Sequence, residues 1–322
     1  MVKMWLVLKC LVLIGMCAQG ALAQNYPVQP IRLVVTSTSG STPDIVGRLI
    51  APGMIQALGQ QVIVDDRPGA ASNIGTEFVA KAPADGYTVL LAMPTNIRNI
   101  SLYRNLSFDF ARDFAAVTRL CSFPMTVVVN ASLPAKSMSD LVKLAKAKPG
   151  AINYSSEGAG SGAFMATELF KMTADVNLMH VPYKGGTPAL TAVVAGETSI
   201  YFAPLAVTLP FVQSGKLRLL AVTSPKRMPA LPDTPAVAES GYAGYEYVSW
   251  FGLMVPAKTP KKTIATIHRA AIAALSRPDV IERLADLGIS PVGDQPEEFA
   301  GYIKSEVEIT RKLIEHTGIT AE

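Results

Sequence analysis

The stretch Thr36-Ser37-Thr38-Ser39-Gly40-Ser41-Thr42-Pro43-Asp44 joins a strand-like apolar run, residues 31–35, to a helix-like run, residues 45–50. Thr42 suits the N-cap of that helix, Pro43 suits its first position, and Asp44 suits its positively polarised first turn. Backbone N–H groups at a helix start, together with Ser and Thr hydroxyls, bind carboxylates and phosphates. An ordinary strand–helix turn is the alternative interpretation. The residues of this stretch that we expect to contact an anion are Ser37, Thr38, Ser39, Gly40 and Ser41.

The same design recurs after residue 150. A strand at residues 152–154 is followed by Ser155-Ser156-Glu157-Gly158-Ala159-Gly160-Ser161-Gly162 and then by a second helix. Open α/β sheets bind ligands at the ends of their strands, so residues that end other strands belong to the same candidate site. The further residues that we expect to contact the anion are Ser155, Ser156, Ser161, Gly162, Thr95, Asn96, Tyr183 and Ala203.

Strand and helix patterns alternate from Ile31 to the end of the 322-residue chain, which predicts an α/β architecture with mainly parallel sheets. A chain of this length favours two domains. The apolar run 117–129 is too long for one typical strand and contains Pro124, so we expect the chain to cross between domains there and to return along residues 248–255. This organisation predicts lobe 1 from residues 24–124 and 248–322, lobe 2 from residues 125–247, and a ligand cleft between them.

Two local expectations follow from helix-breaking residues and from helical spacing. The first helix contains Pro52-Gly53 and should kink or split there. Two helices, with apolar stripes over residues 264–275 and 299–314, should close the chain.

Residues 1–23 are typical of an export signal, because Lys3 and Lys9 flank an apolar run and Ala21-Leu22-Ala23 offers a small-x-small cleavage site. We expect cleavage after Ala23 and a periplasmic location. The formal net charge is +4, without a basic run that would indicate nucleic-acid binding. Once the signal is removed, Cys121 is the remaining cysteine, and its apolar neighbours predict a buried thiol.

Catalytic and cofactor motifs are weak. The histidines His180, His268 and His316 are not spaced as metal ligands, so we expect no metal site. The pattern Gly158-x-Gly160-x-x-Ala163 fits a dinucleotide-binding turn but lacks the acidic residue after the next strand, so we expect no cofactor. An exported hydrolase that uses Ser161 or Cys121 remains an alternative, although no Gly-x-Ser-x-Gly elbow is present.

Short motifs follow one another along nearly the whole chain: Tyr26-Pro27, Pro30-Ile31-Arg32, Asp44-Ile45-Val46, Arg67-Pro68-Gly69-Ala70, Asn73-Ile74-Gly75, Asp85-Gly86-Tyr87-Thr88, Leu133-Pro134-Ala135-Lys136-Ser137, His180-Val181-Pro182-Tyr183-Lys184-Gly185, Leu231-Pro232-Asp233, Glu239-Ser240-Gly241 and Trp250-Phe251-Gly252-Leu253. In this the chain resembles the tripartite tricarboxylate transporter substrate-binding proteins, also called Bug proteins. The resemblance implies a monomeric periplasmic binding protein of the two-lobed type II fold, without catalytic activity. Such a protein closes like a Venus flytrap on a small organic acid and delivers it to a membrane permease. A periplasmic sensor that signals to a membrane receptor is a further alternative.

The expected binding loops depart from the family pattern. The first loop of the family resembles Pro-Phe-x-x-Gly-Gly, whereas residues 36–41 here are mostly hydroxyl residues. Arg98 stands where an apolar residue is common, and the family's Asp after the aromatic position is missing at Phe202-Ala203-Pro204. Without that Asp, the sequence favours a hydroxylated or purely acidic ligand over an amino acid.

Overall fold

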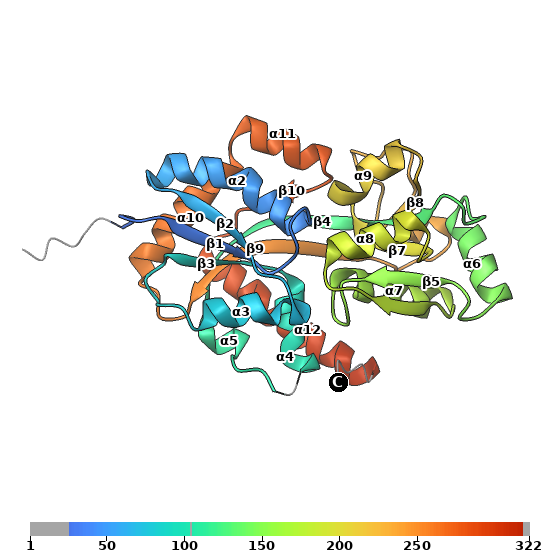
Figure 1. Ribbon diagram of the computed structural model, residues 1–322, viewed down its shortest axis with the longest axis horizontal. Coiled ribbons are helices and arrows are strands. Elements are labelled where there is room, and N and C mark those ends of the chain that lie inside the picture. Colours follow the sequence, from blue (N-terminus) through green and yellow to red (C-terminus); the bar gives the residue numbers. More distant parts are fainter. Residues whose placement is uncertain (1–25, 104, 318–322) are drawn as a thin grey trace, which may run out of the picture.

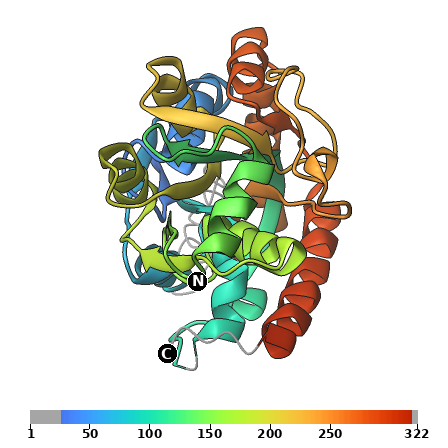
Figure 2. The same cartoon turned by 90° about the vertical axis from the view of Figure 1, so that its right-hand side faces the viewer.

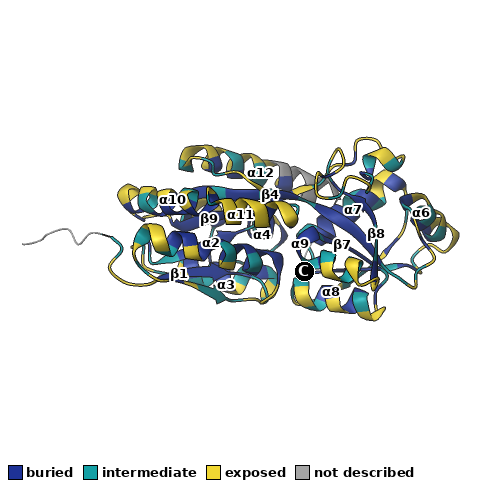
Figure 3. Ribbon diagram, turned by 90° about the horizontal axis from the view of Figure 1, so that it is seen from above, coloured by how far each residue is buried: buried dark blue, intermediate teal, exposed yellow. Residues whose placement is uncertain are grey.

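The chain folds into two α/β lobes that lie side by side along its longest axis (Figures 1 and 3). The computed structural model describes residues 26–103 and 105–317. The export signal expected at residues 1–23 lies outside the described residues.

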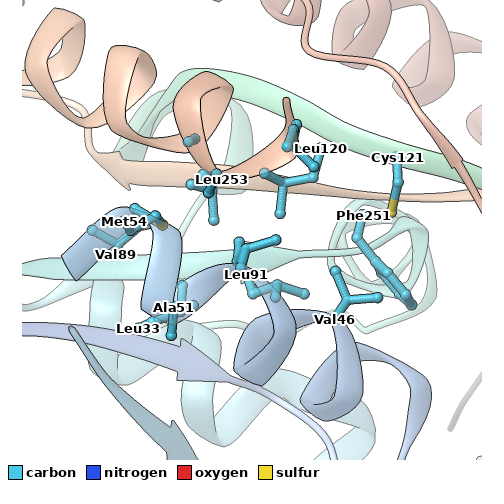
Figure 4. Packing of buried hydrophobic residues seen from close by; sticks show 14 of the residues in the cluster. Leu33, Val46, Ala51, Met54, Val89, Leu91, Leu120, Cys121, Phe251 and Leu253 are labelled. Atoms are coloured by element: carbon cyan, nitrogen blue, oxygen red, sulfur yellow. The ribbon is translucent and has the colours of Figure 1, made fainter. Parts of the chain in front are cut away.

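Lobe 1 is built on three parallel strands in the order β2-β1-β3: β1 (Ile31–Val35), β2 (Val62–Asp66) and β3 (Thr88–Ala92). Side chains that alternate along β1 enter two hydrophobic cores on opposite faces of the sheet, as the period of a strand requires. Leu33 packs in the core beneath α2 (Thr42–Leu58), whereas Val34 packs in the core beneath α3 (Asn73–Ala80). Figure 4 shows the first of these cores, with Leu33, Leu91 and Leu253 of the sheet facing Val46 and Met54 of α2.

The other elements of lobe 1 cover these two faces. One face is covered by α2, α10 and α11, and the other by α3, α4, α5 and α12. The bounds of the elements not yet given are η1 (Ala70–Ser72), α4 (Pro94–Leu102), α5 (Phe110–Asp113), α10 (Lys261–Leu275), α11 (Pro278–Asp286), β10 (Ser290–Pro291) and α12 (Pro296–Thr317).

Two long antiparallel strands connect the lobes. β4 (Phe114–Asn130) pairs with β9 (Val248–Pro256) in lobe 1, and beyond Pro124 it pairs with strands of lobe 2 instead. Phe123 lies directly opposite Ser249. The runs 117–129 and 248–255, along which the sequence analysis expected the chain to cross and to return, therefore lie side by side in the structure.

Lobe 2 has a mixed sheet in which β5 pairs in parallel with β6 and β7, while β4 pairs antiparallel with β7 and β8. Its own hydrophobic core includes Tyr154, Phe170 and Phe202. Figure 2 shows the molecule with this lobe facing the viewer. The bounds of its elements are α6 (Met138–Ala147), β5 (Asn153–Ser156), α7 (Gly162–Ala174), β6 (Met179–Pro182), α8 (Gly186–Ala195), β7 (Ile200–Pro204), α9 (Leu205–Gln213), β8 (Leu217–Val222) and η2 (Ala238–Ser240).

Several local predictions were wrong. The split expected in α2 is absent, since the helix runs through Pro52. Pro52 lies on the exposed face, where water can hydrogen-bond to the carbonyl that loses its partner. The N-cap of α2 is Ser41 and not Thr42. Pro94-Thr95-Asn96 is the first turn of α4 and not a loop. The chain closes with three helices instead of two, since α11 lies between α10 and α12.

Candidate functional site

A cavity of about 710 Å³ lies between the two lobes, within the range of small-molecule sites. Lobe 1 contributes residues of its first loop, of the turn before α3 and of the start of α4, and lobe 2 contributes the loops that follow β5, β6 and β7. Apolar side chains on the crossing strands, Phe123, Met125 and Phe251, form part of the wall. A ligand in this cavity would therefore touch both lobes and the strands that connect them.

Six helices begin at the cavity. The first or capping residues of α2, α3 and α4 in lobe 1, and of α7, α8 and α9 in lobe 2, line its wall. Each helix start carries N–H groups without partners inside the helix and the positive end of the helix dipole. Their convergence makes the cavity a site for negatively charged groups.

The first loop carries two buried hydroxyls on the cavity wall. Thr36 and Ser41 are 2% and 4% exposed, and neither Thr36 Oγ1 nor Ser41 Oγ has a hydrogen-bond partner among the described residues. The loop is held by Asp44, whose Oδ2 accepts a hydrogen bond from the Gly40 N–H at 2.8 Å and whose Oδ1 lies 2.6 Å from Arg48 Nε. Asp44 thus holds the loop in place without using the Thr36 and Ser41 hydroxyls, which keep unused hydrogen-bonding capacity beside the cavity.

The predicted residues of the first loop divide into two groups. Ser37, Gly40 and Ser41 line the cavity. Thr38 and Ser39 lie outside it and contact Thr187 of lobe 2: Thr187 Oγ1 donates to the Ser39 carbonyl at 2.9 Å, and Thr38 Oγ1 donates to Thr187 Oγ1 at 3.2 Å. These two residues join the lobes at the rim of the cavity.

The second hydroxyl loop divides in the same way. Ser161 and Gly162 line the cavity, and Ser161 Oγ accepts a hydrogen bond from the Phe164 N–H at 3.2 Å as the N-cap of α7. Ser155 and Ser156 belong to β5 and are fully buried outside the cavity wall. Ser156 Oγ lies 2.6 Å from His180 Nε2, so the two side chains are hydrogen-bonded to each other.

Of the other predicted residues, Thr95 and Tyr183 line the cavity. Asn96 is buried and caps α4, where its Oδ1 accepts from the Met93 N–H at 2.7 Å and its Nδ2 donates to Thr76 Oγ1 at 2.8 Å. Ala203 is buried within β7, and its carbonyl accepts from Thr126 Oγ1. Asn96 and Ala203 do not reach the cavity.

The turn before α3 lines the cavity and was missed by the sequence analysis. Ala70, Ala71 and Ser72 all have positive φ, at 45°, 50° and 76°, a conformation that costs energy for residues other than Gly. Ser72 Oγ donates to the Thr36 carbonyl at 3.1 Å, which ties this turn to the first loop. Strained backbone of this kind is concentrated at binding sites. Gly69 was the single residue in the sequence that could have indicated it.

The loops of lobe 2 contribute further residues that the sequence analysis did not select. Glu157, His180, Lys184 and Tyr201 line the cavity, so Glu157 and Lys184 place opposite charges on its wall. Burial lowers the pKa of His180, opposed by Glu168 and assisted by Lys171, so the imidazole favours its neutral form. Burial, followed by the charge of Glu157, raises the pKa of Tyr201, whose hydroxyl therefore stays protonated and donates to Glu157 Oε1.

A second contact joins the lobes beside the cavity. Arg98 on α4 is 7% exposed, and its guanidinium donates to the Gly160 carbonyl at 3.2 Å and to Tyr247 Oη at 2.8 Å. Gly160 lies in the second hydroxyl loop, where an added Cβ would come within 2.2 Å of Leu102 Cδ1. The lobes therefore meet closely around Arg98.

Within residues 26–103 and 105–317, no group of three or more His, Cys, Asp or Glu side chains is arranged to hold a metal ion. Across the same part of the chain, no helix is both long and apolar enough to cross a membrane.

Cys121 is fully buried beside Phe251 (Figure 4), and burial raises its pKa to about 12.

Comparison with known proteins identifies the family. The family described as "Tripartite tricarboxylate transporter family receptor" matches residues 46–319. The chain belongs to this family. Its members are solute-binding receptors and not enzymes, so the hydrolase alternative is set aside.

Three solved structures share the fold of this family member over most of their length. The periplasmic binding protein BugD is 31% identical, with a TM-score of 0.87 over 92% of this chain and 99% of that one. Rpa4515 of R. palustris, solved with adipate, is 34% identical, with a TM-score of 0.88 over 92% and 99%. MatC (Rpa3494) of Rhodopseudomonas palustris, solved with malate, is 27% identical, with a TM-score of 0.84 over 90% and 100%. The two-lobed α/β fold and the resemblance to Bug proteins are confirmed.

Proposed function

We propose that this protein captures a small organic acid between its lobes and delivers it to a membrane permease of the tripartite tricarboxylate type. The observation that carries the proposal is the cavity itself, where six helix starts converge and the Thr36 and Ser41 hydroxyls lack partners among the described residues. The acids in the two Rhodopseudomonas palustris structures, adipate and malate, support a carboxylate as ligand.

The proposal includes the location and the organisation of the chain. Export through cleavage after Ala23 agrees with the periplasmic location of family members. Apart from Ala206, each hydrophobic cluster falls within one lobe, which supports residues 24–124 and 248–322 as lobe 1 and residues 125–247 as lobe 2. In the proposed site, Ser37, Gly40, Ser41, Thr95, Ser161, Gly162 and Tyr183 contact the ligand, and Thr38 and Ser39 act in closure.

A thermal-shift screen of the protein without residues 1–23 tests the proposal, using mono-, di- and tricarboxylates beside neutral sugars. A ligand that binds only the folded state stabilises it by about 2.7 kcal/mol at a hundredfold excess over its Kd. We expect one or a few acids to raise the melting temperature and the sugars to leave it unchanged. A shift with sugars alone would refute carboxylate binding.

Replacement of Ser161 by Leu places a bulky side chain on the cavity wall and should abolish the shift. Ser305→Leu, at an exposed site on α12, is the control. Delivery to a permease is tested separately, by uptake of the identified acid in cells with and without this protein.

A further inference from the structure

A carboxylate lies in the wall of a cavity that otherwise suits anions. Among the described residues that line the cavity, Glu157 is the one acidic residue. A ligand consisting only of carboxylates and carbon would be repelled by this group at short range. The presence of Glu157 is explained if it faces a part of the ligand that donates hydrogen bonds.

Glu157 is held in a defined position. Its Oε1 accepts the hydrogen bond from Tyr201 Oη, and Tyr201 is 1% exposed on β7. Its Oε2 is buried and has no hydrogen-bond partner in the part of the chain that the structure describes. A buried carboxylate oxygen without a donor is costly, and a ligand donor would remove that cost.

Glu157 also lies where the two lobes approach each other. A Cβ added at Gly186, the first residue of α8, would lie 3.5 Å from Glu157 Oε1, 3.6 Å from Tyr201 Oη and 3.8 Å from Ser41 Cβ. Glu157 of lobe 2 and Ser41 of lobe 1 therefore converge on the same helix start. An acid bound there would place its carboxylate among N–H and hydroxyl donors, within a short distance of the Glu157 acceptor.

We infer that Glu157 is a specificity-determining residue that selects organic acids carrying a hydroxyl or ammonium group near a carboxylate. The inference rests on the proposed function and deepens it. It differs from the expectation from the sequence, in which the missing Asp after Phe202 disfavoured an ammonium group. Ala203 at that position does not reach the cavity, and Glu157 on a neighbouring loop offers the acidic side chain instead.

Titration calorimetry with three series of matched acids tests the inference: succinate, malate and aspartate; glutarate, 2-hydroxyglutarate and glutamate; adipate, 2-hydroxyadipate and 2-aminoadipate. Within a series the members differ only in whether C2 carries hydrogen, hydroxyl or ammonium. A site that hydrogen-bonds a ligand donor strongly rejects the analogue that lacks it. In the series whose chain length fits the cavity, we expect the protein to bind the hydroxy or the amino acid at least tenfold more tightly than the unsubstituted acid.

The variants Glu157→Gln and Glu157→Leu separate charge from hydrogen bonding. Gln keeps a hydrogen-bond acceptor but loses the charge. It should therefore reduce the preference for the amino acid over the unsubstituted acid at least tenfold, and reduce the preference for the hydroxy acid by a smaller factor. Leu removes the acceptor and should abolish both preferences. Tyr201→Phe removes only the hydroxyl that positions Glu157 and should reduce the preference partially. Glu246→Gln, at an exposed site away from the cavity, should leave every affinity unchanged.

The outcomes distinguish the two proposals. If unsubstituted acids bind as tightly as their hydroxy and amino analogues, or if Glu157→Leu leaves the preference intact, the inference is overturned and carboxylate binding stands. If none of these nine acids binds while another carboxylate raises the melting temperature in the screen, the inference is overturned and carboxylate binding stands. If no carboxylate binds in either experiment, the proposed function fails and the inference fails with it. Melting temperatures of the ligand-free variants confirm that each one is folded.

Discussion

Replacement of Arg98 by Met should weaken ligand binding without weakening the fold. Arg98 joins α4 of lobe 1 to Gly160 and Tyr247, through hydrogen bonds of 3.2 Å and 2.8 Å. When the lobes separate, these bonds are exchanged for bonds to water. They therefore stabilise the closed arrangement relative to the open one, and Met keeps much of the packing of the Arg side chain.

The magnitude follows from the hydrogen bonds and from the population of the closed form. A hydrogen bond to a charged group contributes about 1.5–3 kcal/mol. Arg98 makes two, but water replaces both when the lobes separate. We therefore assign about 1.5–3 kcal/mol to the pair as its stabilisation of the closed form. Ligand affinity falls with the fraction of binding-competent molecules when the open form predominates. Because about 1.4 kcal/mol corresponds to a factor of ten, the Kd should rise roughly 10- to 100-fold.

The assay is titration calorimetry with the acid found in the screen, together with urea unfolding of the ligand-free protein. Tyr247→Phe removes only the 2.8 Å hydrogen bond and should reduce the free energy of ligand binding less than Arg98→Met does. The double variant should reduce it by less than the sum of the two single variants. Arg277→Met, which affects an exposed pair with Asp279, is the matched control. A Kd for Arg98→Met within twofold of wild type would refute the role of Arg98 in closure.

Three further predictions concern the fold. Gly53→Val should destabilise the protein by about 1–3 kcal/mol in urea unfolding, because a Cβ at Gly53 would lie 2.7 Å from Ala274 Cα. Burial lowers the pKa of His180, so the unfolded state binds a proton at this residue more readily than the folded state does. The free energy of unfolding should therefore decrease as the pH falls through about 6.5, and this decrease should be smaller in the His180→Gln variant. Cys121, with its pKa raised to about 12, should not react with a thiol reagent at pH 8 until the protein is unfolded.

The fold was largely predictable because its strands are short apolar runs separated by Gly, Pro and polar residues. The apolar run 117–129 with Pro124 in its middle indicated the crossing strand, and the structure places the crossing at that proline. Helix α9 was missed because it contains Pro210 and is apolar on most sides, so no amphipathic period indicates it. Pro52 misled the prediction because sequence alone does not show which face of a helix meets solvent.

Some predicted site residues lie outside the cavity because strands extend one or two residues beyond the expected boundaries. The sequence pattern ended the strand before the second hydroxyl loop at Tyr154, whereas β5 continues to Ser156, so Ser155 and Ser156 are buried in the sheet and the cavity wall begins at Glu157. Likewise β7 includes Ala203, and it is Pro204 that reaches the cavity. The positive φ values around Ala71 depend on tertiary contacts and leave no pattern in the sequence beyond Gly69.

Two aromatic residues of the cavity wall belong to the strands that connect the lobes. Phe123 on β4 and Phe251 on β9 line the cavity, and their rings lie 4.7 Å apart. Both residues belong to the strands that cross between the lobes, Phe123 being paired with Ser249 at the crossing itself. The first loop lacks the aromatic residue typical of the family, and these two rings supply an apolar wall at the connection between the lobes. A ligand packed against these rings would touch the strands that connect the lobes. If the lobes close on the ligand as proposed, binding and closure would therefore depend on the same residues, together with the interlobe hydrogen bonds of Thr187 and Arg98.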